Sequence, residues 1–315
     1  MAWVAINCPQ CSAPLPRVAI WRSVKCPSCG ALVTRNESIV TRDSFRQAWL
    51  RARQNGGNGH ESGVSCGGSQ YQLLSQLGTG NVSEVYLARR LGNLPILATL
   101  KLSSNANAAA QYAREAEVLR TLQSGPNEAD VAYAAQCLPQ VVACGPVEGL
   151  GSRFALILRH PNGYWGSLAA LGQRFPDGID PRHAVWIWRR MLDVLSFVHA
   201  QGWYHGDVRP EHALVHPRDH AVRLIGWGSA QKGSNAKAQA TDLLRSARVL
   251  EVLLSGLTGL RSLSGRVPAG LVELIKRASE DEAFCADHGA RGLDNLLRAA
   301  AREAYGAPAF VPLHV

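Results

Sequence analysis

This sequence of 315 residues lacks any long hydrophobic run, although 46% of its residues are hydrophobic. No stretch of about 18 consecutive apolar residues occurs, so we predict no membrane span. The N-terminus also lacks a basic segment followed by an apolar one. We therefore predict no signal peptide and expect the protein in the cytoplasm. Charged residues make up 18% of the chain, an ordinary share for a protein with a packed core.

Lysine is scarce, since only five of the 33 basic residues are Lys, and the arginines are spread along the whole chain. The formal net charge of +9 and the pI of about 9.4 would suit a polyanionic partner. Nucleic-acid-binding domains usually gather their basic residues in a patch or stripe. Nucleic-acid binding is therefore a minor candidate function, and salt-dependent binding to an arbitrary duplex would identify it.

Four of the eight cysteines form two CxxC pairs with 14 residues between them. Each such turn lets two thiolates reach one tetrahedral ion. We predict a structural zinc ribbon over residues 1–40 with Cys8, Cys11, Cys26 and Cys29 as the ligands. A redox dithiol is the alternative, but it needs only one pair. Because so short a segment buries little core, zinc binding would supply most of its folding free energy, on the order of 10 kcal/mol.

Residues 41–70 are predicted to connect the ribbon to the rest of the chain. Residues 41–54 carry two aromatic side chains four positions apart, which indicates a short helix packed on a neighbour. Residues 55–69 are rich in Gly and Ser and show no hydrophobic periodicity. This composition is typical of a flexible linker, in which Cys66 would carry an exposed thiol.

The most informative stretch is residues 204–230, which read YHGDVRPEHALVHPRDHAVRLIGWGSA. It resembles the catalytic loop and the metal-binding turn of protein kinases. His205-Gly206-Asp207 stands where kinases carry His-Arg-Asp, Arg209-Pro210 where they carry Lys-Pro, Glu211-His212 where they carry Glu-Asn, and Gly226-Trp227-Gly228 where they carry Asp-Phe-Gly.

The resemblance assigns catalytic roles and also reveals two losses. Asp207 would orient and deprotonate the acceptor hydroxyl, and Arg209 would help to balance the charge of the transferred phosphoryl group. The two residues that hold magnesium in working kinases are replaced by His212 and Gly226, so we expect no magnesium to be bound. Gly206 replaces the Arg that receives the phosphate of a modified activation segment. That switch would therefore not operate here.

Three further motifs of the family precede this stretch in the family's order. Residues 77–86, LGTGNVSEVY, resemble the glycine-rich loop over the ATP phosphates, with Ser83 replacing the third Gly. An ordinary glycine hairpin is the alternative. Lys101 resembles the phosphate-binding Lys, and Glu115 its partner on a helix; alone, the two would more often form a solvated pair worth under about 1 kcal/mol. The implied site for ATP or another nucleotide consists of Gly78, Gly80, Ser83, Val85, Ala98, Lys101 and Glu115.

The resemblance covers roughly residues 71–305 and implies an α+β fold of two lobes. Residues 71–158 would form the N-lobe, and residues 159–315 a reduced C-lobe that begins at the hinge. Helical spacing predicts C-lobe helices over 183–200, 241–256, 271–278 and 293–304, and the tail 307–315 is expected to lie extended along them.

The segment between Gly228 and the helix predicted from Thr241 is short and polar. Protein kinases carry a roughly twofold longer activation segment here, which ends in Ala-Pro-Glu and positions the peptide substrate. By resemblance, Asp242 would brace the backbone of the catalytic loop. A plain helix N-cap is the alternative.

Three functions are therefore considered. The leading hypothesis is a pseudokinase that holds a nucleotide weakly and acts on a protein partner as a scaffold or allosteric regulator, with the ribbon as a docking module. The alternative is an atypical Ser/Thr kinase, or another phosphate or nucleotide transferase, that uses Asp207 with altered metal ligation. The third is the nucleic-acid-binding adaptor considered above.

Overall fold

The computed structural model describes residues 24–25, 32–33, 63–79, 83–92, 96–125, 127–149, 151–233, 235–256 and 266–315. The chain divides into two compact units, Met1–His60 and Glu61–Val315. In the first unit, β1 (Val24–Lys25) pairs antiparallel with β2 (Leu32–Val33). The four predicted zinc ligands and the predicted helix at 41–54 lie outside the described residues.

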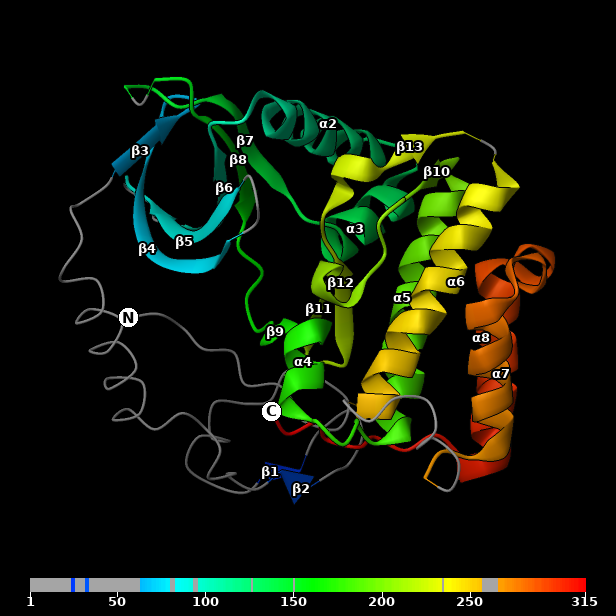
Figure 1. The fold of residues 1–315 in the computed structure, drawn as a ribbon. Coiled ribbons are helices and arrows are strands. Elements are labelled where there is room, and N and C mark those ends of the chain that lie inside the picture. Colours follow the sequence, from blue (N-terminus) through cyan, green and yellow to red (C-terminus); the bar gives the residue numbers. More distant parts are fainter. Residues whose placement is uncertain are drawn as a thin grey trace. The chain divides into compact units, whose positions relative to one another are not determined.

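An antiparallel sheet of six strands forms the first half of the second unit, in the order β3-β4-β5-β6-β8-β7 (Figure 1). Its strands are β3 (Gly63–Cys66), β4 (Ser69–Thr79), β5 (Glu84–Arg90), β6 (Leu97–Ser103), β7 (Val141–Pro146) and β8 (Phe154–Arg159). In β6, Ala98, Leu100 and Leu102 alternate with less buried neighbours, as expected for a strand with one face on a core. Two helices, α2 (Ala106–Leu122) and α3 (Glu128–Cys137), separate β6 from β7.

The structure corrects the predicted flexible linker where the described residues begin. Gly67 and Gly68 both have positive φ angles, 59° and 70°, and join β3 to β4 in a two-residue hairpin turn. The glycines therefore serve a tight turn rather than a flexible chain. The prediction that Cys66 is an exposed thiol is also wrong, because its side chain is fully buried and its Sγ donates to the carbonyl of Gly145 at 3.8 Å.

Strand β3 also closes the sheet on itself. Ser65 forms an isolated antiparallel bridge with Glu148, just after β7, and its carbonyl accepts a hydrogen bond of 2.9 Å from the Glu148 N–H. The strands thus curve around one core, as Figure 1 shows. The buried side chains inside are Val64, Cys66, Tyr71, Ala88, Ala98, Leu100, Leu102, Val147, Ala155 and Ile157.

Helices dominate the second half of this unit. They are α4 (Leu168–Arg174), α5 (Pro181–Ala200), α6 (Ala236–Ser255), α7 (Ala269–Glu280) and α8 (Glu282–Tyr305). Helix α6 packs against α5, α7 and α8, and the buried Nε1–H of Trp188 on α5 donates to Ser246 on α6 at 3.0 Å. The short strands are β9 (Gly166–Ser167), β10 (Trp203–Tyr204), β11 (Ala213–His216), β12 (Ala221–Leu224) and β13 (Gln231–Lys232); β12-β11-β9 form one sheet and β10-β13 another.

The predicted helices of this half are confirmed, with shifted starts. Helix α5 begins two residues earlier than predicted, after Asp180, whose carboxylate accepts from the Arg182 N–H. Helix α6 begins at Ala236 instead of Thr241, and its N-cap is Asn235. The tail after α8 contains no helix or strand; Leu313 is buried there, and Phe310 stacks on His220 with ring centroids 4.2 Å apart.

Candidate functional site

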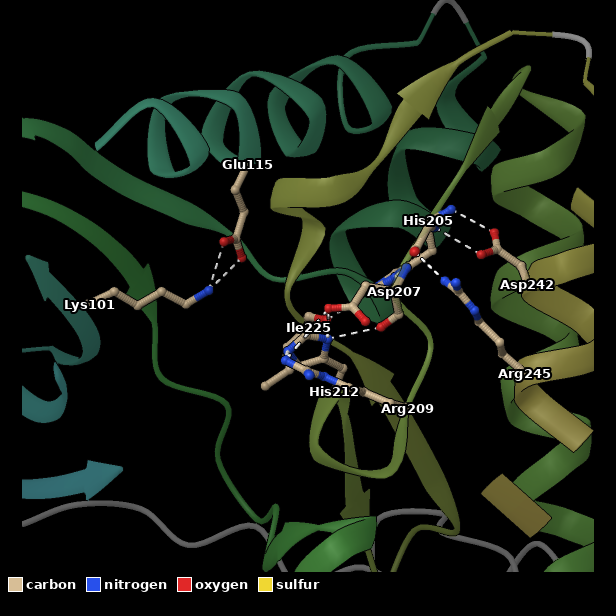
Figure 2. A network of polar contacts seen from close by, with 10 residues as sticks. Lys101, Glu115, His205, Asp207, Arg209, His212, Ile225, Asp242 and Arg245 are labelled. Carbon is tan, nitrogen blue, oxygen red and sulfur yellow. Dashed lines mark hydrogen bonds and ion pairs between the residues drawn. The ribbon is translucent and has the colours of Figure 1, made fainter. Parts of the chain in front are cut away.

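The side chains of Lys101 and Glu115 meet between β6 and α2. The Lys101 Nζ lies 2.8 Å from Oε1 and 2.7 Å from Oε2 of Glu115 (Figure 2). The Glu115 side chain is only 3% exposed and that of Lys101 15%. The alternative of a solvated surface pair is therefore wrong. A carboxylate so well buried needs its partner, because an unpaired buried charge is strongly destabilising.

The glycine-rich residues lie at the turn between β4 and β5. Gly78 pairs with Val85, and Thr79 pairs with Glu84, so the loop is the tip of a hairpin. Ser83 and Val85 are half-buried, whereas Ala98 on the neighbouring strand β6 is fully buried. Gly80 lies outside the described residues. A hairpin of this geometry occurs both in ordinary turns and in the nucleotide-binding loops of kinases. The feature that distinguishes this hairpin from an ordinary turn is Lys101, which pairs with Val85 on the neighbouring strand.

The loop after β10 is held by the central helix α6. The fully buried carboxylate of Asp242 accepts hydrogen bonds from the backbone N–H groups of His205, at 2.6 Å, and Gly206, at 2.9 Å. Arg245, almost one turn further along α6, donates to the carbonyl of Gly206 (Figure 2). Asp242 therefore braces the loop, and the alternative of an N-cap is wrong because Asn235 caps this helix. Sequence reasoning missed Arg245, although its spacing from Asp242 places both on one helix face.

The ring of His205 ties this loop to the turn after β12. Its Nε2 lies 3.1 Å from the carbonyl oxygen of Ile225, and its Nδ1 lies 3.2 Å from the backbone N of Asp207. Because the carbonyl can only accept and the amide can only donate, Nε2 carries the proton. Complete burial lowers the pKa of His205 to about 4, so the ring is neutral. Trp227 packs beside it, with ring centroids 4.4 Å apart, and is itself fully buried.

Steric crowding at position 206 explains why a glycine stands there. Its φ angle is +78°, and a Cβ atom at this position would lie 2.7 Å from the carbonyl oxygen of Ser229. A backbone oxygen has little freedom to move away. Only glycine therefore fits here, and the Arg that kinases carry would require a different path of the loop.

Asp207, Arg209 and His212 form a cluster at the surface of the loop (Figure 2). His212 Nδ1 lies 2.9 Å from the backbone oxygen of Asp207 and 3.2 Å from its Oδ2. Its Nε2 lies 3.0 Å from a guanidinium nitrogen of Arg209. Burial lowers the pKa of His212, which favours the neutral ring. Asp207 is 34% exposed and Arg209 52%, so both can meet a ligand from solvent.

Helix α2 docks on the turn that follows Gly226. Arg114 on α2 donates from its Nε to the carbonyl of Ala230 at 2.9 Å. A Cβ atom at Gly228 would lie 3.4 Å from the carbonyl oxygen of Gln111, also on α2. The helix that carries Glu115 thus contacts the turn that follows β12.

The side chains at positions 212 and 226 offer no oxygen ligand to a metal ion. Magnesium prefers oxygen ligands in octahedral geometry, whereas Gly226 has no side chain and both ring nitrogens of His212 have partners. Among the described residues, no group of three or more His, Cys, Asp and Glu side chains could hold a metal ion. By their chemistry, Gly226 and the engaged ring of His212 do not fit a magnesium ion.

The two-lobed fold, the Lys101–Glu115 pair and the braced loop define the class of protein kinase-like domains. Comparison with known proteins agrees: the sequence profile of the protein kinase domain matches residues 71–247. The chain belongs to the protein kinase domain family.

Two curated kinases resemble part of the chain. Serine/threonine-protein kinase PknD of Mycobacterium tuberculosis is 34% identical over 165 residues, which are 52% of this chain and 23% of PknD. Casein kinase II subunit alpha' of Saccharomyces cerevisiae is 23% identical over 168 residues, 52% of this chain and 42% of that protein. The chain thus spans less than half the length of either relative.

Solved structures share the fold. The PknI kinase domain of Mycobacterium tuberculosis superposes with a TM-score of 0.55 and 21% identity, covering 76% of this chain and 99% of that one. Vaccinia related kinase 3 superposes with a TM-score of 0.55 and 16% identity, covering 83% of this chain and 97% of that one.

Within the described residues, no helix is both long and apolar enough to span a membrane.

Proposed function

We propose that this protein is a pseudokinase that acts on a protein partner as a scaffold or allosteric regulator. The observation that carries the proposal is the pair of residues at the family's two magnesium positions, His212 and Gly226. Metal ions in kinases neutralise the charge that develops on the transferred phosphoryl group. Without them, phosphoryl transfer should be slower by several orders of magnitude than in a working kinase.

Nucleotide binding remains part of the proposal. ATP brings about four negative charges, which kinases balance with a Lys, two magnesium ions and backbone dipoles. Here Lys101, the hairpin loop and Arg209 are the groups available. Binding should therefore be weak and largely independent of magnesium.

The N-terminal segment is proposed to be a zinc ribbon that docks the protein partner. The proposal rests on the two CxxC pairs. Elemental analysis of protein purified without chelators should find one zinc per chain. The result is expected to fall to zero when Cys8, Cys11, Cys26 and Cys29 are all replaced by Ser, and zinc-free wild-type protein would contradict the assignment.

A thermal-shift titration with ATP, with and without magnesium or manganese, tests the nucleotide site. Wild-type protein should show a small rise in melting temperature that does not depend on the cation. Lys101→Ala should abolish it, whereas Lys237→Ala, which removes an exposed lysine at the start of α6, should not. A parallel assay for transfer of the γ-phosphate to a generic protein acceptor should give no signal above background.

One observation favours the alternative of an atypical kinase. Asp207 is retained and partly exposed, in a loop that Asp242 and Arg245 hold in place. The substitution Asp207→Ala separates the two functions. A pseudokinase should keep both its ATP-induced shift and its effect on its partner, whereas an enzyme should keep the shift and lose the effect.

A further inference from the structure

The imidazole of His212 lies directly against the α-carbon of Gly226. A Cβ atom built at Gly226 would be 2.8 Å from both Cε1 and Nδ1 of that ring. Real Cβ atoms essentially never approach another atom so closely. The ring therefore occupies the space into which any side chain at position 226 would have to extend.

Both nitrogen atoms of this ring are already engaged. The guanidinium group of Arg209 can only donate hydrogen bonds, so the His212 Nε2 that faces it must accept. The proton then resides on Nδ1, which donates to the backbone oxygen of Asp207. A neutral imidazole in this arrangement has no lone pair left for a cation.

The obstacle at Gly226 differs in kind from the one at Gly206. At Gly206 a Cβ atom would meet the backbone oxygen of Ser229, which no substitution removes. At Gly226 the nearest atoms all belong to one side chain, that of His212. Replacing His212 by a smaller residue would therefore open position 226 but not position 206.

We propose that His212 and Gly226 are an interlocked pair, in which the imidazole fills the space beside Gly226 and joins Asp207 to Arg209. The identities of the two residues then depend on each other. Where the inference concerns nucleotides it rests on the proposed function: a nucleotide bound here would bind without a divalent cation.

A double-mutant cycle on the full chain tests the interlock. Gly226→Ala should lower the melting temperature by about 5 °C or more, because it adds a clash to the strain of a left-handed φ of +81°. In a His212→Ala background, Gly226→Ala should lower the melting temperature by clearly less, since only the φ strain remains. The matched control is Gly206→Ala, whose cost should be the same with and without His212→Ala. Equal costs for Gly226→Ala in both backgrounds would overturn the interlock.

A measurement on the wild-type protein reads the protonation of the His212 ring directly. The ¹⁵N chemical shifts of the His212 ring, assigned by comparison with His212→Ala, should show a protonated Nδ1 and an unprotonated Nε2. The opposite tautomer, or a ring that exchanges between the two, would contradict the proposal.

A titration with ATP and magnesium separates this inference from the proposed function. Gly226→Asp alone should gain no magnesium dependence, because the ring blocks its side chain. His212→Asn with Gly226→Asp should gain it, since Asp tolerates left-handed φ angles better than most residues. A magnesium-dependent shift in wild-type protein that His212→Ala abolishes would make His212 a ligand and refute the inference. Absence of any ATP shift in wild-type protein, together with a coupled cycle, would refute nucleotide binding and leave the interlock in place.

Discussion

The buried pair of Lys101 and Glu115 gives the sharpest prediction about stability. Lys101→Met keeps the length of the side chain and removes its charge, which leaves the Glu115 carboxylate unpaired at 3% exposure. Breaking a buried ion pair in this way costs about 3–5 kcal/mol of unfolding free energy. For a folded unit of this size the melting temperature should fall by about 10 °C.

The double variant Lys101→Met with Glu115→Leu separates the loss of a charge from the loss of the pair. Replacing both partners by apolar residues of similar size is often close to neutral, so most of the lost stability should return. Neither variant should respond to ATP, because both lack the Lys101 ammonium group. The matched control, Lys237→Met, alters an exposed lysine and should change stability by less than about 0.5 kcal/mol.

Urea unfolding followed by tryptophan fluorescence measures these differences, with equal m-values as the condition for comparing them. A loss below about 1 kcal/mol for Lys101→Met would place the pair among solvated surface pairs and refute the reasoning. A double variant no more stable than Lys101→Met would show that the cost came from packing rather than from the unpaired charge.

Three further predictions concern the loop, the pH response and a thiol. Asp242→Ala removes the acceptor of two backbone N–H groups and should lower the unfolding free energy by about 2–4 kcal/mol in urea titrations. The control Asp287→Ala alters a solvent-exposed residue on α8 and should leave the unfolding free energy nearly unchanged. His205 has a pKa of about 4 in the folded protein, below the usual 6.5, so at pH 5 the unfolded chain binds a proton that the folded protein does not. Stability should therefore fall by about 3 kcal/mol between pH 7 and pH 4, less steeply in His205→Phe, and a flat profile would contradict a buried neutral ring. Cys66 should resist iodoacetamide in native protein and react after denaturation, as read by peptide mass spectrometry, since burial raises the pKa of its thiol.

The two lobes follow from the resemblance of the ordered motifs to those of protein kinases, whereas the helices follow from local patterns. Helix α5 follows the spacing of its apolar side chains, and Lys101 and Glu115 were identified by their distance from the glycine-rich loop. The sequence allows two roles for Asp242, since an acidic residue near a helix start is typical of an N-cap. The structure excludes the N-cap role, because Asn235 caps this helix instead.

The features that sequence reasoning missed depend on contacts between distant residues. Strand β3 is short and ends at two glycines, so its composition indicated a linker, and only the bridge from Ser65 to Glu148 shows that it belongs to the sheet. Helix α3 is also short and carries a single fully buried side chain, Ala134, which gives little periodicity to detect. The contact between His212 and Gly226 could not be foreseen, because it joins two motifs through the orientation of one ring.

The place of β3 affects where this kinase-like unit can be cut. The family profile begins at residue 71, whereas β3 begins at Gly63 and pairs with β4 through the turn at Gly67. A chain trimmed to the profile would leave one edge of β4 unpaired and uncover Tyr71, which is now 1% exposed. Unpaired strand edges beside apolar surface are templates for aggregation. A trimmed chain that precipitates would then reveal a missing strand and not an unstable kinase fold.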